Sequence, residues 1–239
     1  MSSSALDVSL SSHGLRLERT QLDQFERYSA LLRDWNTRVN LTSLTDPLQI
    51  DTKHFLDSLT LLLIDPPPPR ARLIDIGTGA GFPGVPLAIA RPDLAVTLVE
   101  SVAKKVRFLE ALIASLALRT VTIAHARAED LAHDSAHRER YDVAVERALP
   151  VLASNLELLL PFCRVGGKAA AYKGRIEAEL PAAGRAASSL GGELTRVATT
   201  AELGVGEELP GRCLVLVTKT RHTPSRYPRG AAEMKRKVW

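Results

Sequence analysis

The chain has 239 residues, of which 45% are hydrophobic and 24% charged. This composition is close to the globular average and excludes a disordered or fibrous protein, and the length fits one large domain, with or without a helical appendage. Only two cysteines are present, Cys163 and Cys213, which argues against a disulfide scaffold and favours a reducing compartment. No apolar run approaches the ~20 residues of a membrane span, and residues 1–10 lack the pattern of a signal peptide. We therefore expect a soluble cytoplasmic protein that does not associate with a membrane.

The net charge of +4 is concentrated at the C-terminus. Residues 219–239 carry seven basic residues and one acidic residue, a net charge of +6, whereas the other 218 residues carry 24 basic and 26 acidic residues, a net charge of −2. Such a segment is typical of contacts with the phosphates of nucleic acid, although a solvated terminus has the same composition. The pattern predicts a basic C-terminal tail over residues 221–239.

The first part of the chain shows helical patterns. Thr20 and Asp23 resemble a capping box, and apolar residues at helical spacing then predict a helix over residues 21–38. Asp46 and Pro47 resemble an N-cap and a first-turn proline, which predicts a second helix that continues to about residue 62. Four consecutive prolines follow, and they cannot continue a helix. We expect residues 1–69 to form an N-terminal helical cap that ends in a proline connector.

Beyond the prolines, short apolar runs alternate with longer helical periods, as in a parallel sheet with helical crossovers. We expect residues 70–220 to form one α/β domain, Rossmann-like, with a mostly parallel seven-stranded sheet. The predicted strands are residues 72–76, 96–100, 120–126, 142–146, 168–172, 193–198 and 212–219. The predicted helices are residues 85–90, 102–116, 151–162 and 177–190, with a short helical turn at 129–133.

A glycine-rich turn joins the first predicted strand to a helix. Gly77, Gly79 and Gly81 occupy the first, third and fifth positions, and Phe82 occupies the sixth, where the dinucleotide fingerprint requires glycine. The Gly-Lys-Ser/Thr ending of a Walker A loop is also absent. A strand that carries Asp75 and ends in this turn is typical of methyltransferases that bind S-adenosylmethionine. The sequence therefore predicts that cofactor.

Acidic residues close the next two predicted strands. Glu100 ends the second strand 19 residues after Gly81, where a carboxylate accepts hydrogen bonds from both ribose hydroxyls, and Ser101 follows it. Arg127, Ala128 and Glu129 end the third strand, where a side chain or a backbone amide contacts the adenine edge. We predict Glu100, Ser101, Ala128 and Glu129 as cofactor-binding residues, together with the glycine turn.

The residues after the fourth predicted strand limit which atom of the substrate can accept the methyl group. This segment reads Glu146-Arg147-Ala148-Leu149-Pro150, without the Asn/Asp-Pro-Pro-aromatic motif of enzymes that methylate the adenine amino group. Methylation at carbon five of cytosine needs a cysteine nucleophile, but Cys163 is predicted at the end of a helix and Cys213 in a late strand, and both are expected to be core thiols. Guanine N7 has an in-plane lone pair and needs no general base, which suits a site built from arginine, lysine and backbone groups.

Several motifs resemble those of the RsmG family, the small-subunit ribosomal RNA methyltransferases also called glucose-inhibited division protein B. The resemblance covers roughly residues 20–229, and its motifs are Trp35-Asn36 with Asn40-Leu41-Thr42, His54-Phe55-Leu56-Asp57-Ser58-Leu59, Phe82-Pro83-Gly84, Lys104-Lys105-Val106-Arg107-Phe108-Leu109, Arg127-Ala128-Glu129, Glu146-Arg147-Ala148 and Tyr172-Lys173-Gly174. It implies a class I methyltransferase that makes 7-methylguanosine at position 527 of 16S rRNA. It also implies that Gly77, Phe82, Ala128, Glu129 and Arg147 contact S-adenosylmethionine.

The remaining candidates follow from position and charge. Arg147, Asn40 and His54 are the candidate catalytic residues. The candidate RNA-binding residues are Lys104, Lys105, Arg107, Arg127, Lys173, Arg226 and Arg229. His133 and His137 have no further ligand nearby in sequence, so no metal is expected. The expected partner is 16S rRNA or the small ribosomal subunit, bound by a monomer.

Two other functions remain open. A non-catalytic RNA-binding or regulatory protein could keep the methyltransferase fold, but it would have no need for the glycine turn and Glu100. Methylation of a protein or small molecule is disfavoured by the basic tail.

Overall fold

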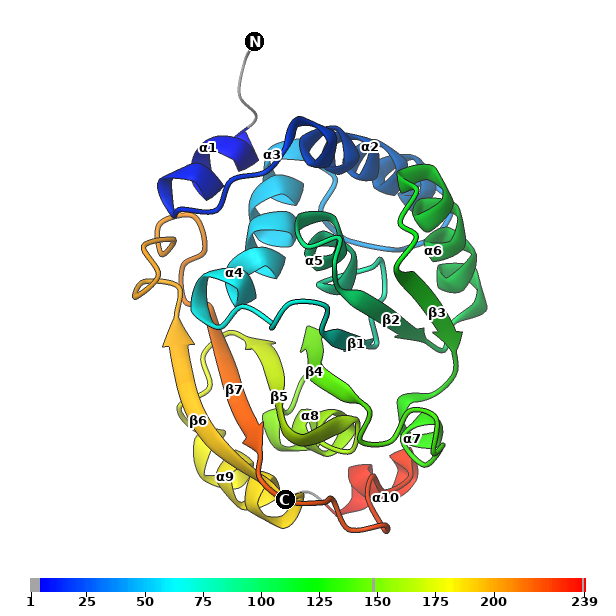
Figure 1. The fold of residues 1–239 in the computed structure, drawn as a ribbon, viewed down its shortest axis with the longest axis vertical. Helices are drawn as coiled ribbons and strands as arrows, with labels where there is room; N and C mark the ends of the chain where they lie inside the picture. Colours follow the sequence, from blue (N-terminus) through cyan, green and yellow to red (C-terminus); the bar gives the residue numbers. More distant parts are fainter. Residues whose placement is uncertain (1–4, 148, 238) are drawn as a thin grey trace.

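The structure is a computed structural model that describes residues 5–147, 149–237 and 239. Ala148 of the predicted site motif, residues 1–4 of the predicted cap and Val238 of the predicted tail lie outside the described residues. The chain forms one seven-stranded sheet covered by helices on both faces (Figure 1). Among the described residues, no helix is long and apolar enough to cross a membrane.

The strand order is β3-β2-β1-β4-β5-β7-β6. The first five strands are parallel, and β7 is antiparallel to both β5 and β6. The strands are β1 (Arg72–Ile76), β2 (Ala95–Glu100), β3 (Val121–His125), β4 (Tyr141–Arg147), β5 (Cys163–Lys173), β6 (Gly192–Thr199) and β7 (Cys213–Lys219). The chain changes direction across the sheet between β1 and β4, and ligands of α/β sheets bind at the carboxyl ends of strands next to such a point.

The two faces of the sheet bury separate apolar clusters. The first cluster joins the sheet to α1 (Ala5–Ser12), α2 (Arg19–Asn36), α3 (Pro47–Ile50), η1 (Asp51–Leu56), α4 (Asp57–Ile64), α5 (Gly84–Ala90) and α6 (Ala103–Leu116). The second cluster joins the sheet mainly to α8 (Leu152–Leu159) and α9 (Leu180–Ser189), with α7 (Ala128–Leu131) at its margin. The last helix, α10 (Ala231–Arg236), lies near the C-terminus. The N-terminal helices therefore share one core with the sheet.

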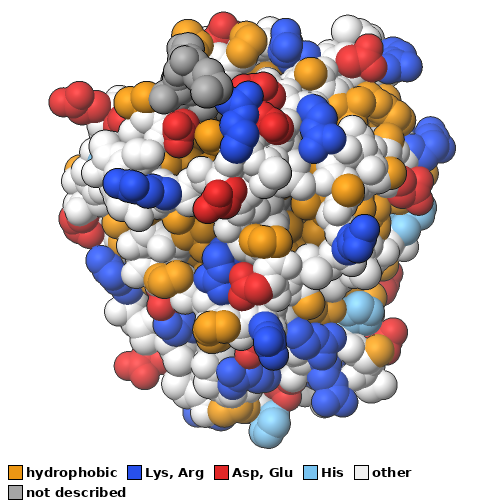
Figure 2. All heavy atoms as spheres, turned by 45° about the horizontal axis from the view of Figure 1, so that its top comes forward, with side chains coloured by type: hydrophobic (Ala, Val, Ile, Leu, Met, Phe, Trp, Pro, Cys, Tyr) orange, Lys and Arg blue, Asp and Glu red, His pale blue; other side chains and the backbone are white. Residues whose placement is uncertain are grey.

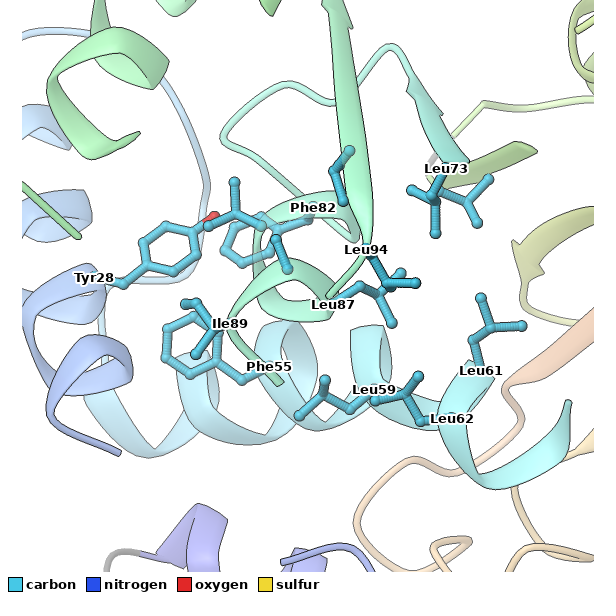
Figure 3. Packing of buried hydrophobic residues seen from close by; sticks show 14 of the residues in the cluster. Tyr28, Phe55, Leu59, Leu61, Leu62, Leu73, Phe82, Leu87, Ile89 and Leu94 are labelled. Atoms are coloured by element: carbon cyan, nitrogen blue, oxygen red, sulfur yellow. The ribbon is translucent and has the colours of Figure 1, made fainter. Parts of the chain in front are cut away.

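Aromatic side chains connect the N-terminal helices to the glycine turn. The rings of Tyr28 from α2 and Phe82 are stacked with centroids 5.2 Å apart, and Phe55 from η1 lies 5.1 Å from Tyr28 and 6.0 Å from Phe82 (Figure 3). The Tyr28 hydroxyl donates a hydrogen bond to the carbonyl oxygen of Ala80 at 2.5 Å. The helical cap thus packs directly against the predicted cofactor turn.

The predicted element order is confirmed, with a few differences at the ends. The capping box of α2 uses Glu18 and Gln21, so the prediction from Thr20 and Asp23 was wrong. Glutamate at the N-cap accepts a backbone hydrogen bond just as threonine would, and the helix starts earlier. Asp46 does cap α3, since its side chain accepts a hydrogen bond from Gln49 N at 2.9 Å. Cys163 begins β5 instead of ending a helix. The sequence did not predict α1, α10 or the π-helical form of η1.

Candidate cofactor and RNA site

Asp75 organises the glycine turn from inside the protein. The side chain is fully buried near the end of β1, and its Oδ2 accepts hydrogen bonds from Thr78 Oγ1 at 2.6 Å and from Gly84 N at 2.8 Å. Its Oδ1 has no hydrogen-bond partner among the described residues. Burial raises the pKa of Asp75 to about 6, although both hydrogen bonds act in the opposite direction. The carboxyl group thus ties β1 to the first residue of α5 and fixes the turn between them.

The three glycines of the turn serve two purposes. Gly77 and Gly79 have φ angles of +67° and +62°, and a Cβ atom on Gly77 would meet no atom within 4 Å, while one on Gly79 would meet only a carbonyl oxygen at 3.9 Å. Gly81 has no such space, because its Cβ would lie 2.7 Å from the Tyr28 hydroxyl oxygen. Gly81 is therefore needed for packing, whereas Gly77 and Gly79 leave an open backbone surface that a ligand can approach. This surface fits a bound nucleoside cofactor.

Glu100 reaches across to this surface from β2. Its carboxylate is 5% exposed, and it accepts hydrogen bonds from Gly79 N at 3.1 Å and from Val102 N at 2.8 Å. Lys105 Nζ lies 4.0 Å from the same carboxylate. Ser101 follows at the exposed strand end. The structure thus brings the predicted ribose-binding acid to the predicted glycine turn, 21 residues apart in sequence.

The residues predicted to contact adenine lie at the end of the neighbouring strand. Ala128 begins α7 directly after β3, and the carboxylate of Glu129 is 3.2 Å from the guanidinium of Arg127. Because β1, β2 and β3 are parallel neighbours, the glycine turn, Glu100 and Glu129 all lie at the carboxyl edge of the sheet. The predicted cofactor residues therefore share one edge.

Phe82 connects this edge to the candidate catalytic residues. The His54 imidazole stacks on the Phe82 ring with centroids 4.4 Å apart, and the guanidinium carbon of Arg147 lies 4.7 Å from the Phe82 centroid. Burial, together with the positive charge of Arg147, lowers the pKa of His54 to about 4, so the imidazole is neutral at pH 7. The side chains of Phe82, His54 and Arg147 form one cluster, which we call the aromatic-arginine cluster.

Arg147 is largely occupied by contacts within the protein. Its side chain is 9% exposed, and its NH1 group donates to the carbonyl oxygens of Lys53 and His54 and to Asp57 Oδ2, at 3.1 to 3.3 Å. The family resemblance predicts that Arg147 contacts S-adenosylmethionine. The structure leaves at most its Nε and part of NH2 for that purpose, so its predicted contact with cofactor or guanine stays a prediction.

Asn36, the last residue of α2, anchors the loop that supports His54, and Asn40 lies in that loop. Asn36 Oδ1 accepts hydrogen bonds from the backbone of Leu41 and Thr42, at 2.8 and 3.0 Å, and its Nδ2 donates to Thr42 O at 2.9 Å. Thr42 Oγ1 is 2.8 Å from His54 Nε2. Asn40 is exposed in this loop, and its predicted catalytic role stays a prediction. The loop thus places a hydroxyl against the far side of the imidazole.

An open cavity of about 600 Å³ lies beside the aromatic-arginine cluster, at the ends of β4 and β5 and the loop before β7. His54 and Tyr172 contribute to its wall, and its charged lining residues are Lys53, Asp57, Arg147, Lys173, Glu208 and Arg212. Four of these are basic and two acidic, so the cavity favours an anionic or electron-rich ligand. Lys53 and Arg212 were not predicted as site residues, and Asp57 was named only as part of a family motif. Asp57 lies one helical turn after His54, a spacing that could have identified it, whereas Arg212 precedes β7 without any local pattern.

Lys173 does not present its charge to solvent as an RNA-binding lysine would. The residue is 6% exposed, and its Nζ donates to the carbonyl oxygens of Leu149 at 2.9 Å and Pro150 at 3.2 Å. Nearby, burial raises the pKa of Glu146 to about 7, and its carboxyl group accepts hydrogen bonds from Asn155 Nδ2 and Leu149 N. Both residues support the loop after β4. The charge of Lys173 therefore holds this loop in place, and its predicted contact with RNA stays a prediction.

The candidate RNA-binding residues at the start of α6 are accessible. Lys104 and Arg107 are exposed, Lys105 is half-buried, and the Arg127 side chain is 59% exposed. On the face shown in Figure 2, Lys and Arg side chains gather in the lower part and are mixed with acidic ones above. The exposed basic side chains that could contact RNA phosphates are therefore not gathered in one continuous surface, and each can be tested by a separate substitution.

The C-terminal segment is packed against the body and does not form a free tail. Arg138 donates to the carbonyl oxygens of Tyr227 at 2.8 Å and Thr223 at 2.9 Å. Arg229 forms an ion pair with Glu157 at 2.6 Å, and Glu157 is fully buried. Arg226, by contrast, is exposed and lies over the Tyr227 ring. The charge of Arg229 is thus paired inside the protein, whereas Arg226 is accessible, and the RNA contacts predicted for both arginines stay predictions.

Sequence comparisons with known proteins identify one family of relatives. A family model described as GidB, rRNA small subunit methyltransferase G, matches residues 21–218. The chain is 51% identical over 222 residues to "Ribosomal RNA small subunit methyltransferase G" of Roseiflexus castenholzii, covering 91% of this chain and 92% of the relative. It is 46% identical over 217 residues to the protein of the same name in Moorella thermoacetica, covering 90% and 89%.

Solved structures share the fold at low sequence identity. A 16S rRNA (adenine(1408)-N(1))-methyltransferase from Catenulisporales acidiphilia has a TM-score of 0.51 and 14% identity, covering 64% of this chain and 87% of that one. The structure of a complex between the Haloferax volcanii Trm112 methyltransferase activator and a methyltransferase gives a TM-score of 0.56 at 12% identity, covering 80% and 98%. The fold is that of the class I methyltransferases.

Proposed function

The chain belongs to the rRNA small subunit methyltransferase G family, and on that basis we propose that it methylates N7 of a guanine in 16S rRNA, at position 527, using S-adenosylmethionine. One observation carries the proposal within the structure. Phe82 closely follows Gly77 and Gly79 in the chain, and its ring contacts His54 and Arg147, which line the basic cavity. One cluster of side chains therefore links the open glycine backbone, where a methyl donor can bind, to a cavity that can hold the acceptor base.

The residues at the carboxyl edge fit the cofactor. The backbone at Gly77 and Gly79 would hold its methionine part, Glu100 its ribose hydroxyls, and Ala128 and Glu129 its adenine edge. Glu100 already accepts hydrogen bonds from Gly79 N and Val102 N, so its carboxylate is held in place to accept further hydrogen bonds from a ligand. When bound, S-adenosylmethionine supplies an electrophilic methyl group on its sulfonium.

The protein's contribution to the reaction is orientation and exclusion of water. Guanine N7 attacks through a lone pair that carries no proton, so the neutral His54 and the cationic Arg147 need not remove one. Phe82 and Tyr172 provide buried aromatic surface next to the cavity. His54 and Arg147 are held by Thr42 and Asp57, and they would define the direction from which the base enters.

We further propose that the enzyme acts as a cytoplasmic monomer on the RNA of the small ribosomal subunit. The fold supports this because one chain contains both the cofactor edge and the cavity.

The test has two parts, because cofactor binding and acceptor choice can fail separately. Calorimetric titration with S-adenosylmethionine should show binding to the wild-type protein. Incubation with labelled cofactor and either 16S rRNA, small subunits, or protein extract should then label RNA alone, and nucleoside mass mapping should find 7-methylguanosine at one position. Binding without transfer to any acceptor would favour a non-catalytic RNA-binding protein, and labelled protein would contradict the proposed acceptor.

A further inference from the structure

Asp57 lies between two arginines that come from distant parts of the chain. Its Oδ2 accepts hydrogen bonds from Arg147 NH1 at 3.1 Å and Arg212 NH2 at 2.8 Å, and its Oδ1 accepts one from Arg212 Nε at 3.2 Å. Arg147 ends β4 and Arg212 directly precedes β7, while Asp57 begins α4. One carboxylate therefore joins three elements at the wall of the cavity.

The carboxylate holds two like charges close together. Both guanidinium groups contact the same oxygen, and the Asp57 side chain is only 5% exposed. Without a carboxylate between them, two cations at this separation repel each other, and burial strengthens that repulsion. Asp57 is therefore the group that permits Arg147 and Arg212 to occupy one wall.

The two arginines differ in what remains available to a ligand. The Arg147 side chain is 9% exposed, and its NH1 is used by acceptors of the protein. The Arg212 side chain is 31% exposed, and only its Nε and NH2 donate to Asp57. Among the described residues, the Arg212 NH1 group has no hydrogen-bond acceptor within the protein, and the residue lines the cavity. Its planar donors suit a phosphate oxygen.

We infer that Asp57 is a positioning residue for the RNA substrate: it aligns the free edge of Arg212 toward a phosphate of the target nucleotide and keeps Arg147 against His54 and Phe82. This inference rests on the proposed function, since it assigns the cavity to the acceptor nucleotide. A second effect adds to the first. The guanine ring becomes positive as N7 takes up the methyl group, and the Asp57 charge offsets one of the two guanidinium charges beside it.

The test is a double-mutant cycle with Asp57→Asn and Arg212→Gln, read out as KM for RNA and kcat at saturating S-adenosylmethionine. Each single variant should raise KM about tenfold. The double variant should raise it little further, because Asp57 acts through Arg212. Asp57→Asn should also lower kcat, whereas Arg212→Gln should change kcat much less, since Arg147 keeps its carboxylate. Equal, additive effects of Asp57→Asn in both backgrounds would show a merely structural role and overturn the inference.

Two further variants keep the test interpretable. Asp142→Asn removes another carboxylate paired with an arginine, Arg164 at 2.8 Å, at the beginning of β4 and away from the cavity, and it should leave KM and kcat unchanged. If Asp57→Asn does not fold, Arg212→Gln can be measured alone, because Asp57 then remains paired with Arg147. An unchanged KM for RNA in Arg212→Gln would overturn the inference. Failure of the proposed function is distinct, since the wild-type protein would then transfer no methyl group to RNA.

Discussion

The contact between the Arg147 guanidinium and the His54 ring determines which nitrogen of the imidazole carries the proton. Arg147 NH2 lies 3.0 Å from His54 Nδ1, and a guanidinium has only donors, so Nδ1 must accept through its lone pair. The single ring proton is therefore on Nε2, which is 2.8 Å from Thr42 Oγ1 and donates to it. Thr42 Oγ1 also accepts a hydrogen bond from Leu44 N. A doubly protonated imidazole would lose the Arg147 contact, and this effect adds to burial, the larger cause of the lowered pKa of His54, which is about 4.

This pairing predicts how stability depends on pH. Below about pH 6.5 the unfolded chain protonates His54, whereas the folded protein does not do so until about pH 4, so folding is disfavoured increasingly across that window. The contribution amounts to about 3 kcal/mol at most. His54→Asn, whose Oδ1 can also accept from Arg147, should lack it. Urea unfolding of both proteins between pH 7 and pH 4 should show the wild type losing more stability, and parallel curves would contradict the assignment.

Gly79→Val should abolish binding of S-adenosylmethionine. The substitution places a branched side chain on the open backbone surface and strains a residue with φ of +62°. Gly14→Val is the matched control, because Gly14 has φ of +79°, a Cβ atom there would meet no atom within 4 Å, and the residue lies after α1, outside the cofactor edge. Calorimetric titration should find binding in the control variant alone. Equal affinity in both variants would remove the glycine turn from the cofactor site.

Arg229→Ala should reduce stability without changing RNA binding at low temperature. Burial by itself raises the pKa of Glu157, but hydrogen bonds from Arg229 and Trp239 bring it below its ordinary value, so the carboxylate stays charged inside the protein. Loss of Arg229 leaves that charge without its cation, which costs roughly 3–5 kcal/mol. Arg226→Ala, three residues away and exposed, should leave the unfolding free energy nearly unchanged.

The measurement for this pair is chemical unfolding together with RNA titration. A variant of Arg229 that kept full stability but bound RNA more weakly would restore its predicted role as a phosphate contact. Deleting residues 221–239 is a poorer test, because it also removes the partner of Glu157.

The exposed cations of α6 should set part of the salt dependence of RNA binding. Lys104→Gln combined with Arg107→Gln removes two accessible charges at the start of the helix. If each contacts one phosphate, the log–log slope of RNA affinity against salt should become shallower by roughly 1.4 for single strands or 1.8 for duplex. Arg119→Gln, an exposed arginine just beyond the other end of α6, should leave the slope unchanged. A slope that did not change in the double variant would place the RNA elsewhere.

The glycine turn and the sheet could be predicted from the sequence because they depend on neighbouring residues. Gly77 and Gly79 need positive φ angles that favour glycine wherever the chain goes next, and alternating apolar runs mark strands before any partner is known. The same local patterns placed Glu100 at the end of its strand, where parallel pairing with β1 brings it to Gly79.

The use of each charge was decided only by the tertiary structure, because a charged side chain takes its role from partners that are distant in the sequence. In the sequence, Lys173 and Arg229 cannot be told apart from cations that bind RNA. In the structure, Lys173 donates to a backbone carbonyl oxygen and Arg229 pairs with the buried carboxylate of Glu157. Asp57 and Arg212 are 155 residues apart, and no periodicity relates them. Their pairing exists because packing of η1 and α4 on the sheet brings the first residue of α4 beside the residue that precedes β7, and desolvation there makes each charge dependent on the other.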